Sequence, residues 1–558
     1  MDRQSKPGPN GFPKTRSGAK RGFSALVLLA WVFSILACSS GYVSSVELTE
    51  TAAAAPTREN TPLPVTAFPT NTAEPVASIP TATETIVVAG SGATPDYTPT
   101  PLKPTRTATH TPTAGPSPTP LPPILYQSQA GDTLPSLAVR FGVAPEEITS
   151  PDPIPAEAYI SPNQLLIIPA RIDMENTSPR QLIIPDSEVV YSPSTVDFDI
   201  NAFVNEAGGY LSTYREWMSM GWLSGADVLK RVAVENSINP RLLLALLEYQ
   251  AGWVYGQPGS LAQRDYPMGY VDFNRRDLYK QLSWAVEQLS IGYYGWQNGL
   301  ITELEFSDGK IVRLWPEANC GTVSIAYYFS RVYNSNDWAN VLHSPDIGFL
   351  ALHEKMYGNP WLRAQTVEPL FPADITQPDL NLPYAAGEAW SFSGGPHPAW
   401  GPNGALAALD FAPPSLKPGC VETNAWVTAS ATGLVVREST GVLVLDLDGD
   451  GYEQTGWVIL YLHVAMKDRV QVGEWITEDD RIGHPSCEGG NATGTHVHIA
   501  RKYNGQWMLA DGPIPMVLSG WRAHAGKEIY QGTMTREDKT ITACTCGDAG
   551  SLASRPRE

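Results

Sequence analysis

The sequence predicts a multidomain α+β protein with three folded parts. A chain of 558 residues is too long to fold around one hydrophobic core. Residues 124–170 have the strand, turn and helix pattern of a small βααβ module, and residues 199–365 carry apolar side chains at helical spacing. Residues 384–525 contain short β-type segments between glycine-rich turns, which favours an antiparallel β-sheet domain. A C-terminal tail is expected at residues 526–558.

The start of the chain has the pattern of an export signal. Basic residues precede an apolar run from Phe23 to Ala37, and this run is shorter than the roughly 20 residues that span a bilayer. Residues 35–40 read ILACSS, which resembles a bacterial lipoprotein cleavage box. The resemblance implies a signal peptide at residues 1–37 and a lipidated N-terminus at Cys38. The protein would then be extracytoplasmic, lipid-anchored to the cell membrane or envelope or released from it; an uncleaved anchor is the alternative.

A long linker follows at residues 38–123. From Thr51 to Pro123 it is a low-complexity tract of Thr, Pro and Ala. Such a tract has too few large apolar residues to offset the entropy lost on ordering, so we expect it to be disordered and extended. It would carry the folded parts away from a membrane.

Charge and cysteine content indicate which partners and which disulfides the protein can have. Neutralising phosphates requires clustered Lys and Arg, so a formal net charge of -19 argues against a nucleic-acid partner. Beyond Cys38, five cysteines remain for a compartment in which disulfides persist. Their connectivity cannot be read from the sequence. Cys420 with Cys487 is the first candidate, because both lie in one predicted domain.

Three short motifs lie in the module at residues 124–170. They are GDTL at 131–134, FGV at 141–143 and NQLLIIP at 163–169, and their order resembles that of a LysM domain. LysM domains bind glycans that contain N-acetylglucosamine, so the resemblance implies docking on peptidoglycan. A small βααβ domain without glycan affinity is the alternative.

The helical part at residues 199–365 has capping residues at the expected helix starts. Ser224 can cap one helix, and Asn239 followed by Pro240 begins another that ends near Glu248. Further helices are predicted over residues 277–294, 320–332 and 345–357.

Residues 238–248 resemble the start of a lysozyme-like transglycosylase core. In that family a Glu at the position of Glu248 protonates the glycosidic oxygen, and apolar burial would raise its pKa enough to keep the proton near neutrality. The family follows this Glu with Ser, whereas this chain has Tyr249. A helical spacer with a solvated or ion-paired Glu248 therefore stays open beside a glycosidase.

Six of the nine histidines fall in residues 384–525, and histidine is the commonest metal ligand. His496 and His498 stand two positions apart in a segment predicted as a strand. Side chains alternate along a strand, so both imidazoles should point into one cleft. One can bind zinc while the other reaches a water or a substrate carbonyl; a chance surface pair is the alternative.

Five residues follow the order of the lysostaphin-type endopeptidases: His397, Asp410, His463, His496 and His498. The first two are 13 positions apart, a spacing that resembles the beta-lytic and staphylolysin subgroup. Flanking phrases at residues 487–490 and 503–505 support the same placement. One small departure is Thr495, where proline is usual.

The resemblance implies a role for each of the five residues. His397, Asp410 and His498 would ligate one zinc ion per domain, and three protein ligands leave a fourth position for water. Zinc lowers the pKa of that water and polarises the scissile carbonyl. His463 and His496 would be catalytic, because they hold the water, accept its proton and stabilise the oxyanion.

The sequence thus predicts a zinc endopeptidase that hydrolyses peptide cross-links of bacterial peptidoglycan. Its partners would be glycan strands, stem or cross-bridge peptides, and a membrane reached through the lipid anchor. Two alternatives stay open: a non-catalytic wall-binding or hydrolase-activating protein, and a bifunctional hydrolase with glycosidase activity at Glu248. His484 and His524 match no family position and are expected to be surface or structural residues.

A second candidate metal site is the acidic phrase DLDGDG at residues 446–451. Asp446, Asp448 and Asp450 place oxygen ligands at alternate positions, which suits Ca²⁺. The twelfth position is Trp457, where an EF-hand needs Glu or Asp. A tight acidic hairpin turn explains the phrase as well, because Asp-Gly favours such turns.

Overall fold

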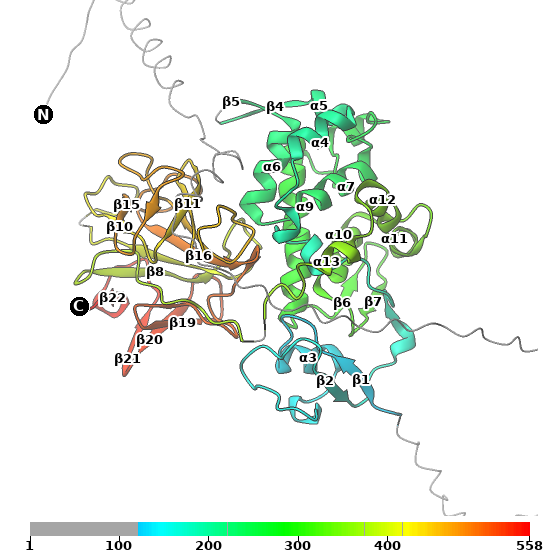
Figure 1. Ribbon diagram of the computed structural model, residues 1–558, viewed down its shortest axis with the longest axis horizontal. Coiled ribbons are helices and arrows are strands. Elements are labelled where there is room, and N and C mark those ends of the chain that lie inside the picture. The colour runs from blue at the N-terminus through cyan, green and yellow to red at the C-terminus, as the bar shows by residue number, and fades with distance from the viewer. Residues whose placement is uncertain (1–120, 220, 373, 416, 558) are drawn as a thin grey trace, which may run out of the picture. The chain divides into compact units, whose positions relative to one another are not determined.

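The computed structural model describes residues 121–558 apart from residues 220, 373, 416 and 558. Residues 122–558 fall within one compact unit (Figure 1). The predicted signal peptide, Cys38 and almost all of the Thr/Pro tract lie outside the described residues. Within the described part, no helix is both long and apolar enough to cross a membrane.

The N-terminal module is a two-stranded antiparallel sheet with one α-helix. Strand β1 (Ile124–Gln127) pairs with β2 (Leu165–Ile168), and α3 (Leu134–Phe141) packs against them. Thr133 caps α3 and Gly142 ends it with a positive φ, as its place after the helix requires. The second helix of the predicted βααβ order is only a short 3₁₀ turn (Pro145–Glu147). Ile148 itself is buried in the core of the module, and Thr149 bridges to β2.

The module is firmly attached to the helical part of the chain. Arg140 is buried, forms an ion pair with Asp132 at 2.8 Å and donates a hydrogen bond to the carbonyl of Trp296 at 3.0 Å. Tyr159 of the module packs against Phe371, with ring centroids 5.0 Å apart. A fully buried guanidinium is costly unless it is paired and hydrogen-bonded, so this contact has one defined geometry.

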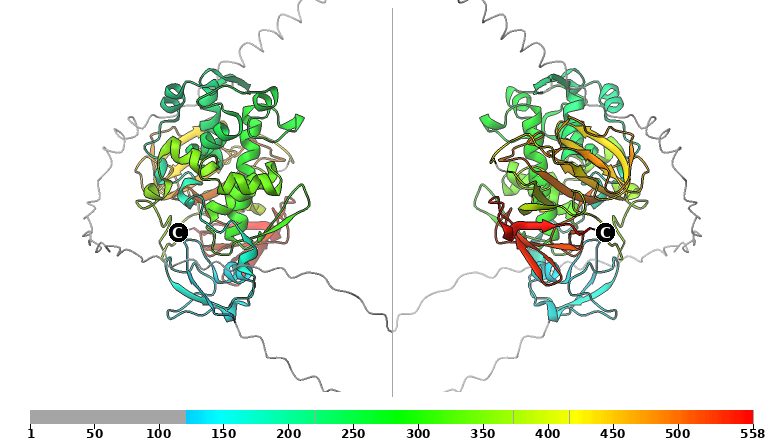
Figure 2. Two further views of the ribbon diagram at one scale, coloured as in Figure 1. Left: turned by 90° about the vertical axis from the view of Figure 1, so that its right-hand side faces the viewer. Right: turned by 90° about the vertical axis from the view of Figure 1, so that its left-hand side faces the viewer.

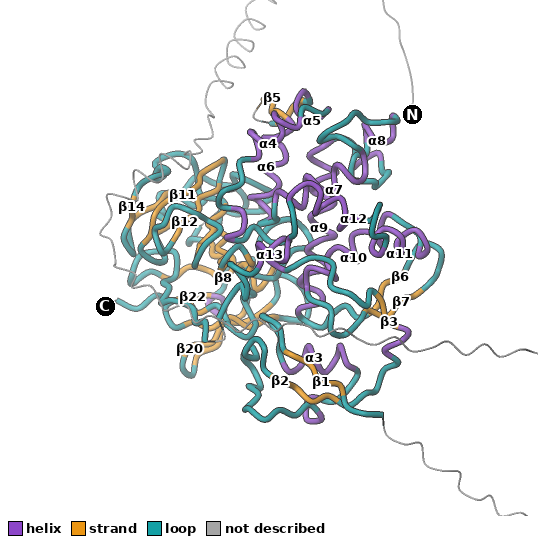
Figure 3. Tube along the Cα trace, turned by 45° about the vertical axis from the view of Figure 1, so that its right-hand side comes forward, coloured by secondary structure: helices purple, strands orange, loops and turns teal. Residues whose placement is uncertain are grey.

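The middle of the chain is mostly helical (Figure 3, helices in purple). Ser224 caps α6, Asn239 caps α7 with Pro240 at its first position, and the helix expected at residues 320–332 is present with those bounds, so these predictions are confirmed. The helix expected over residues 345–357 begins only after Gly348, and a helix in front of it was not predicted. The helices are α4 (Ile200–Ala207), α5 (Tyr210–Thr213), α6 (Gly225–Asn236), α7 (Pro240–Ala251), α8 (Leu261–Asp265), α9 (Leu278–Gln297), α10 (Cys320–Val332), α11 (Ser335–His343), α12 (Phe349–Tyr357) and α13 (Pro360–Ala364).

Short strands accompany these helices. A hairpin precedes α6, and a three-stranded sheet lies between α9 and α10 in the chain, with its third strand supplied from upstream. They are β3 (Thr177–Ser178), β4 (Arg215–Met218), β5 (Gly221–Ser224), β6 (Glu303–Glu305) and β7 (Ile311–Leu314).

The C-terminal part is built on one antiparallel sheet, which confirms the predicted sheet type. Its strand order is β14-β11-β12-β13-β16-β9-β8-β22, with β17 paired to β16 and a separate pair β10-β15. The bounds are β8 (Ala389–His397), β9 (Ala408–Ala412), β10 (Val427–Thr428), β11 (Gly433–Ser439), β12 (Val442–Asp446), β13 (Trp457–Leu462), β14 (Trp475–Ile476), β15 (Arg481–Gly483), β16 (Val497–Tyr503), β17 (Gln506–Trp507) and β22 (Leu552–Ser554).

The predicted C-terminal tail is wrong, because residues 526–558 belong to the sheet body (Figure 2, red strands). Strand β22 pairs with β8, and a four-stranded sheet contains β18 (Val517–Leu518), β19 (Trp521–Ala525), β20 (Gly532–Arg536) and β21 (Lys539–Thr542). Met534 and Ile541 are buried on one face of this hairpin, and polar side chains alternate with them. This period-2 pattern is short, which makes the strands hard to recognise from the sequence.

The two faces of the large sheet have different neighbours. On β16, Val497 and Ile499 belong to the core of the sheet body, whereas Ala500 belongs to a core shared with the helices. Hydrogen bonds join the same parts: Trp507 N–H donates to the hydroxyl of Tyr294 at 3.0 Å. Because side chains alternate along a strand, His498 lies on the face of Ala500, toward the helical part.

Candidate metal centre

Three predicted ligands come together on neighbouring strands. His397 ends β8, Asp410 lies in the middle of β9, and His498 lies in β16 directly opposite Asp410. His397 Nε2 is 2.9 Å from His498 Nδ1, and each of these nitrogens is 3.3 Å from Asp410 Oδ1. Ligands about 2.0–2.1 Å from a tetrahedral zinc ion lie about 3.3 Å from one another, so the three atoms fit such an ion.

Backbone carbonyls set the orientation of both histidine ligands. His397 Nδ1 is 2.8 Å from the carbonyl of Gly395, and His498 Nε2 is 3.1 Å from that of Ala399. A ring nitrogen facing a carbonyl must carry the proton, so the opposite nitrogen presents its lone pair to the centre. Such outer hydrogen bonds commonly fix the tautomer and the ring orientation of metal ligands.

The surroundings of Asp410 are those of a carboxylate suited to binding a cation. Its Oδ1 is buried and has no hydrogen-bond partner among the described groups. Burial alone would raise the pKa of Asp410, but the histidines around it, His397 foremost, hold that pKa well below its usual range. The donor set of two imidazoles and one carboxylate therefore fits zinc in both geometry and chemistry.

Two further histidines line the same centre from the side. His463 follows β13 and His496 precedes β16, with ring centroids 4.5 Å apart. His463 Nδ1 faces the carbonyl of Glu488 and His496 Nδ1 that of Gly494, each at 2.7 Å. Both rings therefore leave Nε2 free to accept a proton. Burial, with His496 and His498 nearby, lowers the pKa of His463 to about 4, so this ring is neutral near pH 7.

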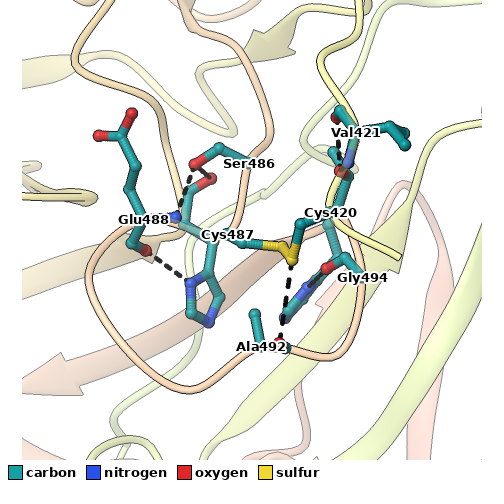
Figure 4. Close-up of a disulfide and its surroundings, with 10 residues drawn as sticks. Cys420, Val421, Ser486, Cys487, Glu488, Ala492 and Gly494 are labelled. Carbon is teal, nitrogen blue, oxygen red and sulfur yellow. Dashed lines mark hydrogen bonds between the residues drawn. A yellow bond between two sulfur atoms is a disulfide. The ribbon is translucent and has the colours of Figure 1, made fainter. Parts of the chain in front are cut away.

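A disulfide stabilises the loops that supply these two carbonyls (Figure 4). Cys420 and Cys487, the pair favoured by the sequence, are joined with Cα atoms 5.8 Å apart. Cys487 directly precedes Glu488, and the loop segment after Cys420 contacts the loop that leads to His496. Thr495 Oγ1 donates to the carbonyl of Val421 at 2.6 Å and accepts from its N–H at 2.8 Å. Thr495, which stands where proline is usual, thus attaches this loop to Val421 in addition to the disulfide.

One residue of the centre, Tyr530, is not predicted from the sequence. Its ring stacks on His397 with centroids 4.3 Å apart, and its backbone pairs with Gly395 and Pro396. Burial and the charge of Asp410 raise the pKa of its phenol. Tyr530 lies in the stretch assigned to a tail; recognising the β20–β21 hairpin would have placed it in the sheet body.

The remaining candidates lie outside this centre. His484 contacts the carbonyl of Ala425, and His524 bonds to the hydroxyl of Thr535, so both have structural partners as expected. Glu248 Oε2 accepts the backbone N–H groups of Val254 and Tyr255 at 2.8 and 3.1 Å, and it closes the turn after α7.

Asp446, Asp448 and Asp450 also lie close enough together to hold an ion. However, their carboxylates accept N–H groups of their own loop, from Asp448, Asp450, Gly451 and Tyr452. These contacts are those of an acidic turn between β12 and β13, and they do not support calcium.

Comparisons with known proteins give the class of protein. Residues 182–370 match the family described as "LasA, N-terminal domain". This match covers most of the part for which the sequence predicts a lysozyme-like fold, and that fold stays a prediction. The similarities support a metalloendopeptidase.

The relatives are named proteases. Protease LasA of Pseudomonas aeruginosa (strain UCBPP-PA14) is 23% identical over 320 residues, which is 54% of this chain and 70% of that protein. Beta-lytic metalloendopeptidase of Achromobacter lyticus is 27% identical over 164 residues, 28% of this chain and 41% of that protein. Among solved structures, the M23 metalloprotease pseudoalterin is 24% identical, with a TM-score of 0.26 over 31% of this chain and 96% of that one.

Proposed function

We propose that this protein is a zinc endopeptidase that hydrolyses peptide cross-links of bacterial peptidoglycan. The observation that carries the proposal is the meeting of His397 Nε2, Asp410 Oδ1 and His498 Nδ1 within 3.3 Å, with both rings oriented by backbone carbonyls. The similarity to LasA and to the beta-lytic enzyme supports the same conclusion.

The proposed roles follow from which atoms are free. His397, Asp410 and His498 would hold zinc, which when bound supplies Lewis acidity for activating water and polarising a carbonyl. His463 presents a neutral Nε2 and would accept a proton from the attacking water. His496, beside it, would steady the water, and the ring that has taken up the proton of the water at Nε2 would donate it to the oxyanion that develops on the carbonyl.

Two further elements would deliver the enzyme to its substrate. The module at residues 124–170 would dock on glycan strands as a LysM domain, and Cys38 would anchor the chain to the membrane through lipid. The attachment of the module through buried Arg140, which donates to the carbonyl of Trp296, supports a fixed distance between docking and cutting.

The test compares His498→Ala with His496→Ala. Losing a ligand removes much of the binding energy, so His498→Ala should lose bound zinc and peptidase activity together. His496→Ala should keep near-stoichiometric zinc and lose on the order of a hundredfold or more in turnover. Metal analysis beside a peptide cleavage assay measures both. Zinc loss confined to His496→Ala would reverse the assignment, and full activity in either variant would exclude this centre.

The same assay separates the two alternative functions. A non-catalytic wall-binding protein would show no cleavage even when loaded with zinc. A glycosidase acting through Glu248 would leave new reducing or anhydro sugar ends on wall fragments, whereas a peptidase leaves new amino termini. Mass spectrometry of digested walls distinguishes these products.

A further inference from the structure

A cavity of about 620 Å³ lies between the helical part and the sheet body. Helix α6 and the β4–β5 hairpin form one wall, and the turn between β11 and β12, with Gly489, Gly490 and Trp400, forms the other. Just after α6, Ser237 Oγ donates to the carbonyl of Gly505 at 2.6 Å, so the two walls are held together. The volume lies within the range of about 300–1,000 Å³ typical of ligand sites, so the cavity can take a short peptide.

The cavity reaches the candidate metal centre at two points. Gly490 lies against the ring of His463, because a Cβ atom at this glycine would be 3.5 Å from Cε1 of that ring. Trp400 directly follows Ala399, whose carbonyl orients His498. A peptide bound with its scissile carbonyl at the centre would therefore continue into this cavity.

The wall formed by α6 carries a buried ion pair with two unused atoms. Arg231 Nε donates to Glu235 Oε1 at 2.9 Å, one turn further along the helix. Arg231 Nη1 and Glu235 Oε2 are buried and have no hydrogen-bond partner among the described groups. Glu235 as a whole is only 6% exposed. Leaving a buried donor and a buried acceptor unpaired costs free energy, so a ligand that pairs with both is favoured.

The surroundings of Glu235 are those of a carboxylate with too few donors. Burial raises the pKa of this group even though Arg231, Arg437 and the hydroxyl of Tyr279 oppose the rise. Arg437 is held elsewhere, because its Nε donates to both carboxylate oxygens of Glu453 at 3.1 Å. A further donor that reaches Oε2 would stabilise the charged form. A peptide backbone offers such a donor in each N–H, and it offers an acceptor for Arg231 in each carbonyl.

We propose that this cavity is the subsite for the peptide that continues from the scissile bond, with Arg231 Nη1 and Glu235 Oε2 pairing with a backbone carbonyl and a backbone N–H of the substrate. The proposal rests on the proposed function and deepens it. It makes the helical part a contributor to substrate recognition, because both side chains belong to α6.

The test measures kcat and KM of the full chain on two substrates. One is a cross-linked muropeptide, and the other is a short synthetic peptide with only the residues that flank the same scissile bond. In Glu235→Gln the amide oxygen stays with Arg231, so an NH₂ group replaces the acceptor Oε2. Arg231→Lys keeps the charge and the pairing but removes the second arm of the guanidinium.

Each variant should raise KM for the muropeptide about tenfold and keep kcat within about twofold, because binding is lost while the centre is intact. The kinetics on the short peptide and the zinc content should not change. Arg180 and Glu175 form an exposed ion pair outside the cavity, at 2.6 Å. Arg180→Lys and Glu175→Gln make the same two changes there, and they should leave the kinetics on both substrates unchanged.

The outcomes separate this proposal from the proposed function. An unchanged KM for the muropeptide in both α6 variants overturns the subsite and leaves the peptidase intact. Equal losses on the two substrates, or loss of zinc, would mean that the pair acts through the fold, which also overturns the subsite. Absence of cleavage of either substrate by the zinc-loaded parent chain overturns the proposed function and the subsite with it.

Discussion

Two groups of three side chains in the sheet body could hold a metal ion by distance alone. One is His397, Asp410 and His498; the other is Asp446, Asp448 and Asp450. Their surroundings differ. In the first group the outer ring nitrogens face carbonyls and the inner atoms face one another, leaving Asp410 Oδ1 without a hydrogen-bond partner. In the second, the carboxylate oxygens accept N–H groups of their own loop.

The difference shows that proximity does not define a metal centre. A buried polar atom left unpaired costs free energy, so an orphaned carboxylate oxygen among inward-facing lone pairs requires a cation. Carboxylates that close a turn have their partners already. Burial, together with Asp448 next to it, raises the pKa of Asp446 to about 9, so without an ion this carboxyl carries a proton near pH 7.

The largest expected effect contrasts Asp410→Asn with Asp446→Asn, the same change in each group. Asp410→Asn removes the negative charge of a direct ligand. Mutating groups that only contact metal ligands lowers metal affinity by up to about 100-fold, so this change should lower zinc affinity by more than that, and activity should fall with it. Asp446→Asn should keep zinc and activity within about twofold. Metal analysis and peptide turnover measure both. Zinc loss in the Asp446 variant would mean that the two groups are not independent.

An intermediate effect is expected from removing the Cys420–Cys487 disulfide by double Ser substitution. The loops that present the carbonyls of Glu488 and Gly494 should loosen, while those that orient His397 and His498 stay in place. Turnover should fall on the order of tenfold with zinc retained, because general acid–base groups act only when positioned. Cys544 and Cys546, also paired, provide the control. Equal losses in both double variants, or loss of zinc, would contradict this division.

The smallest effect concerns the pH dependence of stability. The pKa of Asp446 is about 9 in the fold and 3.8 as a reference, so the folded state binds the extra proton and its stability falls as pH rises between these values. Asp446→Asn removes the carboxyl that titrates. Between about pH 5 and about pH 9 the Tm of the parent chain should fall a few degrees more than that of the variant. Millimolar calcium should not raise the parent Tm at either pH, and a clear rise would restore a calcium site.

Much of the centre could be predicted from the sequence because its ligands carry chemical signatures. The His-x-His pair, together with the order of His397, Asp410 and His463, which resembles that of the lysostaphin-type endopeptidases, indicates the side chains of the centre before any fold is known. The carbonyls that orient these rings have no signature, because every residue carries one. Tyr530 was missed for a related reason: its stack on His397 joins residues far apart in the chain.

The prediction of helix starts from the sequence is limited in a similar way. Where a cap and an apolar period agree, as at Ser224 and Asn239, starts were predicted correctly. Helix α11 was missed because its start, after Asn334, is rich in residues that favour turns. The sequence predicts that the next helix begins at Pro345, but that helix begins after Gly348.

One hydrophobic core runs from the helices into the metal-bearing face of the sheet, where it includes Val442, Leu460 and Ala500. Each Å² of such apolar surface returned to water costs about 25 cal/mol. Opening the helical part therefore also exposes strands β12, β13 and β16. The two parts should lose their structure in one cooperative transition, and the helices are a folding partner of the sheet.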